Sequence, residues 1–131
     1  MKTALDNCFE VLLNRLYYDG KNLTVELKEQ VLVGIGKRKS IESNSDSRDF
    51  RVVFSLAVSH LLVEEFAESV ANLVQSDEKG FLRKMENQLL NNLLGLDVPG
   101  RCENLDCYAL LTSHETLIVF CENSPTVELI C

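Results

Sequence analysis

The sequence predicts an all-α domain of stacked antiparallel helix hairpins that spans residues 1–131. Leucine is abundant, Trp is absent, and leucine is among the better helix formers. Apolar residues recur at spacings of three and four, which is the pattern of one helical face. Short polar turns separate the apolar runs, and short connections make consecutive helices antiparallel neighbours.

A first helix is predicted between an N-cap at Thr3 and a C-cap at Gly20. Its apolar stripe comprises Leu5, Cys8, Phe9, Leu12, Leu13 and Leu16. A second helix is predicted near residues 24–35, where apolar residues lie four apart. A strand over residues 31–33 competes with it, because β-branched residues favour strands and Gly34 weakens a helix.

Residues 40–49 form the one stretch of low hydrophobicity and predict a flexible loop between two helix pairs. Residues 50–75 then predict a long helix that is apolar nearly all round. Such a helix is buried at the centre of a fold or covered by another chain. A further helix is predicted after the polar turn 76–79, with an apolar stripe from Phe81 to Leu96, and Gly95, Pro99 and Gly100 end it.

The last third of the chain has two interpretations. Its β-branched and aromatic residues favour three strands, over residues 107–112, 116–121 and 126–131. The alternative fold is then α+β, with four N-terminal helices and a C-terminal three-stranded antiparallel meander. Helix start signals also occur there, as a capping box at residues 112–115 and a Ser-Pro pair at residues 124–125. Caps are specific to position, so the helical interpretation is preferred.

The pattern as a whole resembles armadillo- or HEAT-type helical repeats. The resemblance rests on leucine-rich helix pairs, on the turns Asp19-Gly20-Lys21-Asn22 and Ser76-Asp77-Glu78-Lys79, and on Ser124-Pro125 opening a helix. No repeat aligns with another at a fixed period, which departs from the family pattern. The resemblance implies a scaffold that binds other proteins, and it transfers no functional residue to this chain.

Charge and composition exclude several classes of partner. The net charge of −7 lacks the basic footprint of a nucleic-acid-binding protein. No apolar run reaches the roughly 18 residues that a membrane span needs, and no signal peptide is visible, so we expect an intracellular protein of the cytoplasm or nucleus. The chain stops on the apolar run 127–131, which suggests a fragment of a longer chain.

The sequence contains no catalytic motif, so we expect neither an enzyme nor a cofactor. The one candidate metal site is a zinc site formed by Cys102, Cys107, His114 and Cys121. Its spacing includes no pair of cysteines two residues apart. Buried free thiols are the preferred interpretation of the cysteines.

The predicted function is therefore a non-enzymatic scaffold or adaptor that presents an apolar helix face to a protein partner or to a second copy of the chain. The predicted contact residues are Val58, Leu62 and Phe66. Two alternatives remain open: an α+β regulatory or small-ligand-binding protein, and a small module stabilised by zinc on the C-terminal cysteines.

Overall fold

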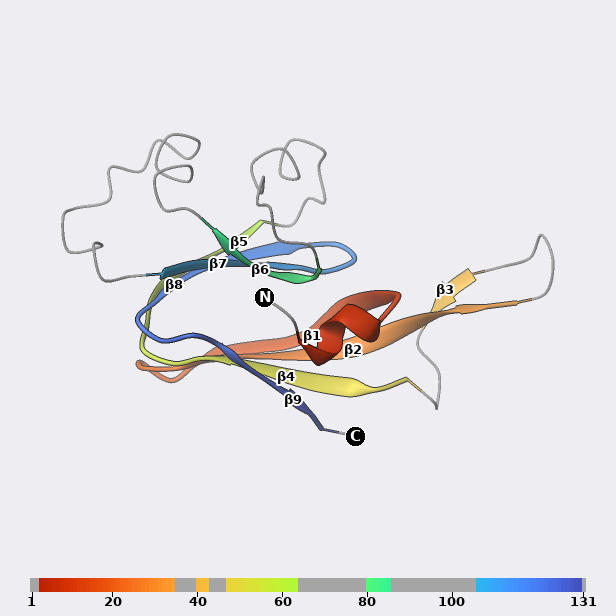
Figure 1. Ribbon diagram of the computed structural model, residues 1–131, viewed down its shortest axis with the longest axis horizontal. Coiled ribbons are helices and arrows are strands. Elements are labelled where there is room, and N and C mark those ends of the chain that lie inside the picture. Colours follow the sequence, from red (N-terminus) through yellow and green to blue (C-terminus); the bar gives the residue numbers. More distant parts are fainter. Residues whose placement is uncertain (1–2, 35–39, 43–46, 64–79, 86–105, 131) are drawn as a thin grey trace.

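The protein is a β-sandwich in which two antiparallel sheets pack face to face (Figure 1). The structure is a computed structural model, and it describes residues 3–34, 40–42, 47–63, 80–85 and 106–130. A short 3-10 helix, η1 (Ala4–Asn7), precedes the strands. The strands are β1 (Glu10–Tyr18), β2 (Leu23–Val33), β3 (Ser40–Glu42), β4 (Asp49–Phe54), β5 (Ala57–Val63), β6 (Leu82–Met85), β7 (Asp106–Leu111), β8 (Thr116–Cys121) and β9 (Thr126–Leu129).

The first sheet has the strand order β1-β2-β4-β9, with β3 pairing with the end of β2. The second sheet has the order β5-β8-β7-β6. Two described connections cross between the layers, from β4 to β5 through Ser55 and Leu56, and from β8 to β9 through residues 122–125. Leu56 has φ 55°, a left-handed conformation that is uncommon outside glycine. The first crossover is therefore a strained two-residue corner.

An apolar core fills the space between the sheets. In β4, alternate residues are fully buried, as the two-residue period of a strand requires. Their partners from the other layer include Tyr108, whose ring centroid lies 6.3 Å from that of Phe54. The core residues contributed by the strands of the two sheets include Val11, Leu23, Val25, Leu27, Phe50, Val52, Phe54, Leu82, Tyr108, Leu110, Leu117 and Val119. The other face of β7 and β8 is also buried, at Cys107, Ala109 and Ile118.

The predicted all-α fold, with its armadillo- or HEAT-like stack, is wrong. The predicted first helix is β1 preceded by η1, and the predicted second helix is β2. A spacing of four residues is shared by a helical face and by two periods of a strand, so the apolar pattern of β2 did not distinguish them. In β1, a bulge at Asn14 places both Leu13 and Leu16 against the core, three residues apart as on a helix.

The predicted long helix over residues 50–75 is wrong over residues 50–63, which form β4, the corner and β5. Within the helix predicted after the polar turn at residues 76–79, residues 82–85 form β6. Residues 64–75 of the first segment, and residues 86 onwards of the second, lie outside the described residues. The α+β alternative is also wrong, because strands replace its N-terminal helices. Its three C-terminal segments are strands, but β9 pairs with β4 in the first sheet, so they form no meander.

The polar segment 40–49, predicted as a flexible loop, contains β3 at residues 40–42 and the first residue of β4. Residues 43–46 lie outside the described part of the chain. No helix among the described residues is long and apolar enough to cross a membrane.

Candidate functional site: an uncharged edge strand

Among the described residues, four strands end the two strand orders: β1 and β9 in the first sheet, β5 and β6 in the second. The short β3 lies off this order and pairs only with β2. An edge strand offers unpaired backbone groups to other chains, and charged side chains commonly protect it. Such charges are present on β1 (Arg15), β6 (Arg83) and β9 (Glu128). The fourth edge strand, Ala57–Val63, contains no Asp, Glu, Lys or Arg. In the described part of the chain, β5 pairs only with β8.

The same strand exposes large apolar side chains. Val58 is 61% exposed, Leu61 is 43% exposed and Leu62 is 37% exposed. Val58 lies at a bulge in the pairing with β8, and the register is regular from Ser59 to Val63. A regular edge of five residues is the length of an ordinary strand, so it can accept a strand from another molecule.

One aromatic residue of the first sheet, Tyr18, lies beside these side chains. Tyr18, near the edge of its own sheet, donates its hydroxyl to the carbonyl oxygen of Ala57 at 2.9 Å. Its ring centroid lies 6.0 Å from that of His60, with the two rings tilted by 55°. Tyr18 remains 45% exposed. The edges of the two sheets therefore meet along β5. The exposed residues on and beside this edge are Tyr18, Val58, His60, Leu61 and Leu62, and we call them the β5 surface.

A small pocket of about 180 Å³ lies where β5 begins. Val58 and Leu56 contribute apolar walls, and Lys21 and Glu122 contribute charges of opposite sign. Backbone hydrogen bonds hold the pocket together, from the Ala57 N–H to the Lys21 carbonyl oxygen (2.9 Å) and from the Glu122 N–H to the Leu56 carbonyl oxygen (3.3 Å). The pocket is large enough for one side chain of a partner and continues the β5 surface.

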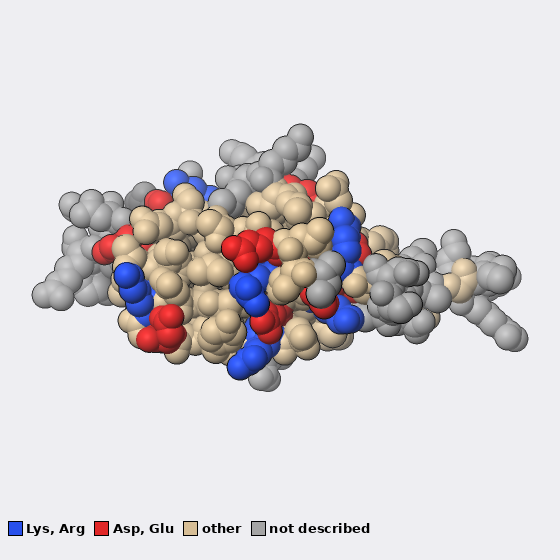
Figure 2. All heavy atoms as spheres, turned by 90° about the horizontal axis from the view of Figure 1, so that it is seen from below, with Lys and Arg blue, Asp and Glu red and all other residues tan. Residues whose placement is uncertain are grey.

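The outer face of the first sheet is charged (Figure 2). Positively and negatively charged side chains are interleaved on the face seen there. Arg51 lies 3.5 Å from Glu26 and 3.8 Å from Glu128, which gives a ladder of charges across β2, β4 and β9. Lys28 and Asp49 form another cross-strand pair at 3.5 Å. Exposed pairs of this kind contribute little free energy but keep a sheet face hydrated, so the apolar interaction surface lies elsewhere.

Two of the three predicted contact residues, Val58 and Leu62, lie on the β5 surface, although on a strand and not on a helix. Phe66 lies outside the described residues. The importance of Leu61 and Tyr18 was missed. The available signal was the absence of charge from residue 57 to residue 63, which identifies an unprotected edge only when the segment is recognised as a strand.

The predicted zinc ligands are dispersed. Cys107 and Cys121 lie on adjacent strands, but only Cys121 belongs to the core between the sheets. His114 is exposed in the turn between β7 and β8, and Cys102 lies outside the described residues, so the complete ligand set stays a prediction. Among the described residues, no three potential metal ligands lie together. Burial raises the pKa of Cys107 to about 12 and the pKa of Cys121 to about 11, so both side chains are protonated thiols near neutral pH.

A partly buried ion pair joins β2 to Arg48, the residue before β4. Arg48 donates from Nη2 and Nε to the two carboxylate oxygens of Glu29, at 2.7 and 3.1 Å. These hydrogen bonds lower the pKa of Glu29 to about 2. Arg48 Nη2 also lies 3.8 Å from Cys8 Sγ, but burial and the Glu29 carboxylate raise the pKa of Cys8 to about 11. The Cys8 thiol therefore stays protonated. The Glu29–Arg48 ion pair has a structural role, because it links β2 to the residue before β4.

The comparisons with known proteins identify no relative. No protein-family model matches the chain, and no curated protein or solved structure matches it significantly.

Proposed function

We propose that this protein is a non-enzymatic binding module that takes up an extended segment of a partner protein along the edge of β5. The observation that carries the proposal is that β5 is the uncharged strand among the four sheet edges, and that it exposes Val58, Leu61 and Leu62. Unprotected apolar edges promote aggregation, so soluble proteins keep them where a partner covers them.

Recognition follows from the geometry of the edge. Backbone groups of the partner pair with β5 from Ser59 to Val63, the stretch of regular register. Leu61 and Leu62 point to opposite faces of the sheet, as successive strand residues do. The partner segment therefore carries apolar residues at consecutive positions, one on each face of the sheet. One further side chain enters the pocket beside Val58.

The same edge suits a second copy of the chain, since two β5 strands can pair antiparallel across a twofold axis. The charge of −7 opposes such self-pairing at low salt, and therefore we favour a different protein as the partner. The proposal places the protein inside the cell, in the cytoplasm or nucleus. Reducing conditions there keep thiols such as Cys8, Cys107 and Cys121 free, as they are in the structure.

Two charge-introducing variants test the proposal. Leu61→Lys places a charge on β5, and Leu129→Lys places the same charge on β9, where Leu129 is 57% exposed. Both positions are exposed, so each variant is expected to melt within a few degrees of the wild type. Affinity purification from the source cells is expected to recover a partner with the wild type and with Leu129→Lys, but not with Leu61→Lys.

The sedimentation coefficient of each purified variant provides the second readout. A dimer that only Leu61→Lys dissociates would identify a second copy as the occupant of β5. Recovery of every partner by a folded Leu61→Lys variant would overturn the proposal.

A further inference from the structure

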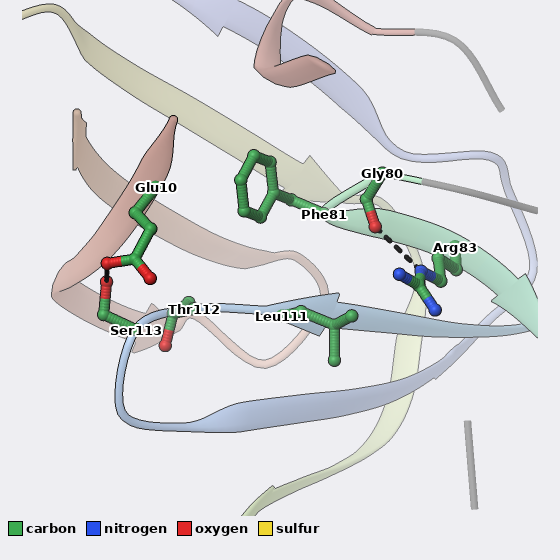
Figure 3. Close-up of a pocket in the computed structure, with 7 residues that line it drawn as sticks. All are labelled: Glu10, Gly80, Phe81, Arg83, Leu111, Thr112 and Ser113. Carbon is green, nitrogen blue, oxygen red and sulfur yellow. Dashed lines mark hydrogen bonds between the residues drawn. The ribbon is translucent and has the colours of Figure 1, made fainter. Parts of the chain in front are cut away.

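A second pocket, of about 350 Å³, lies at the opposite edge of the second sheet from β5. Its volume is at the lower end of the range for small-molecule sites. Glu10 and Ser113 lie at one end, Gly80 and Arg83 at the other, and Phe81 lies between them (Figure 3). These residues come from both sheets and from the turn that joins β7 to β8. None of them belongs to the β5 surface, so a function of this pocket is separate from the one proposed above.

The Glu10 carboxylate has few hydrogen-bond donors. The Ser113 hydroxyl lies 3.2 Å from the Glu10 carboxylate, 3.0 Å from the Val11 carbonyl oxygen and 2.6 Å from Gln30 Oε1. The Val11 carbonyl oxygen also accepts the Ser113 backbone N–H at 2.8 Å, so it does not depend on the hydroxyl proton. If the Gln30 amide is turned so that its nitrogen donates to Ser113, the hydroxyl donates to Glu10 and is the one side-chain donor that this carboxylate has among the described residues. A ligand ammonium group, with three donors, supplies what this end lacks.

At the Arg83 end of the pocket, hydrogen-bond donors outnumber acceptors. Arg83 Nε donates to the Gly80 carbonyl oxygen at 2.8 Å, which fixes the plane of the guanidinium group. Within the described part of the chain, neither Arg83 nor Glu10 takes part in an ion pair. The terminal nitrogens of Arg83 thus present a fork of N–H donors with the geometry of a carboxylate.

The backbone holds this end in place. Gly80 has φ +110°, and a Cβ there would meet the Asp6 side chain. That carboxylate accepts the Thr3 N–H at 3.0 Å, in the capping box of η1. The residue that anchors Arg83 therefore packs against a fixed part of the fold.

Size and lining then define the ligand. A sphere of the pocket's volume, 350 Å³, is about 9 Å across, and two extended residues span roughly 7 Å. We propose that this pocket binds a short zwitterionic peptide of about two residues. Its amino end meets Glu10 and Ser113, its carboxylate meets Arg83, and an apolar side chain packs against Phe81 and Leu111.

The test uses alanyl-leucine and two relatives that each lack one charge, N-acetyl-alanyl-leucine and alanyl-leucinamide. Titration of the intact protein, followed by NMR chemical shifts, is expected to give saturable binding of the dipeptide. Each single-charge relative is expected to bind at least tenfold more weakly, because one end of the pocket loses its partner.

Glu10→Gln and Arg83→Gln remove the two ends separately. Each is expected to weaken dipeptide binding at least tenfold and to abolish the preference over the relative that lacks the matching charge. Lys84→Gln is the control, because Lys84 is adjacent in sequence, pairs with Asp106 and does not line the pocket. No saturable binding at 10 mM dipeptide, equal binding of all three compounds, or unchanged binding by the Glu10 and Arg83 variants would each overturn the inference.

Discussion

Tyr18, on an edge strand of the first sheet, donates its hydroxyl to the carbonyl oxygen of Ala57, on an edge strand of the second, at 2.9 Å. The donor and the acceptor lie 39 residues apart in sequence. The bond joins the first sheet to the first residue of the proposed interaction strand. The bulge follows at Val58, and the regular register begins at Ser59.

Replacing Tyr18 by Phe is expected to lower the free energy of unfolding by about 1 kcal/mol, because the Ala57 carbonyl loses its donor while the ring is kept. Chemical denaturation measures this change. Tyr17→Phe is the matched control, since the neighbouring hydroxyl has no such partner among the described residues. Equal stability of Tyr18→Phe and the wild type would show that the hydrogen bond does not join the sheets in solution.

The corner at Leu56 gives a second prediction. With φ 55°, a residue that has a Cβ is strained by roughly 1 kcal/mol, whereas glycine is not. Leu56→Gly and Leu56→Ala both remove the side chain, but only glycine relieves the strain. The glycine variant is therefore expected to be more stable than the alanine variant by about 1 kcal/mol in denaturant titrations. An alanine variant of equal or greater stability would contradict the left-handed corner.

The Glu29–Arg48 pair predicts an acid transition. Because Arg48 lowers the pKa of Glu29 from 4.5 to about 2, the pair stabilises the fold above about pH 4.5. That contribution is lost as the pH falls from 4.5 towards 2. Glu29→Gln is expected to lower the melting temperature at pH 7 and to weaken its pH dependence in this window.

Arg48→Gln is expected to reproduce the effect of Glu29→Gln, and the double variant is expected to add little, since both changes remove one interaction. Melting temperatures measured from pH 7 to pH 2 test this. A steep acid dependence that persists in Glu29→Gln would assign the transition to other carboxylates.

The buried thiols predict low reactivity. Burial raises the pKa of Cys107 to about 12 and that of Cys121 to about 11. At pH 8 only about a thousandth of a thiol with a pKa of 11 is thiolate, which is the reactive form. Iodoacetamide labelling, mapped by peptide mass, is expected to be slow at both cysteines in the folded protein and fast in guanidinium chloride. Rapid labelling of Cys107 in the folded state would contradict its burial in β7.

The sequence predicted where several elements begin and end better than whether they are helices or strands. The boundaries near Gly20 and the break near residue 113 are turns in the structure, because glycine and short polar residues act locally. The type depended on distant contacts. At β7 and β8 both sheet faces are buried, so their apolar residues run continuously and the two-residue alternation of a half-exposed strand is absent.

The candidate site was predicted in part. Val58 and Leu62 were identified because residues 50–75 carry more apolar residues than one buried face requires. Their arrangement could not be derived from the sequence, since it depends on the corner at Leu56 that moves the chain from one sheet to the other. Likewise, nothing local to Glu10 or Arg83 shows that β1 and β6 bring them to one pocket.

The central claim, that β5 is a binding edge, is tested most directly by photo-crosslinking in the source cells. A photoreactive phenylalanine analogue placed at Leu61 is compared with the same analogue at Leu129, an apolar position on β9 that is at least as exposed. The account predicts a discrete crosslinked partner at position 61 and none at position 129. The same adducts at both positions, or none at position 61, would contradict it.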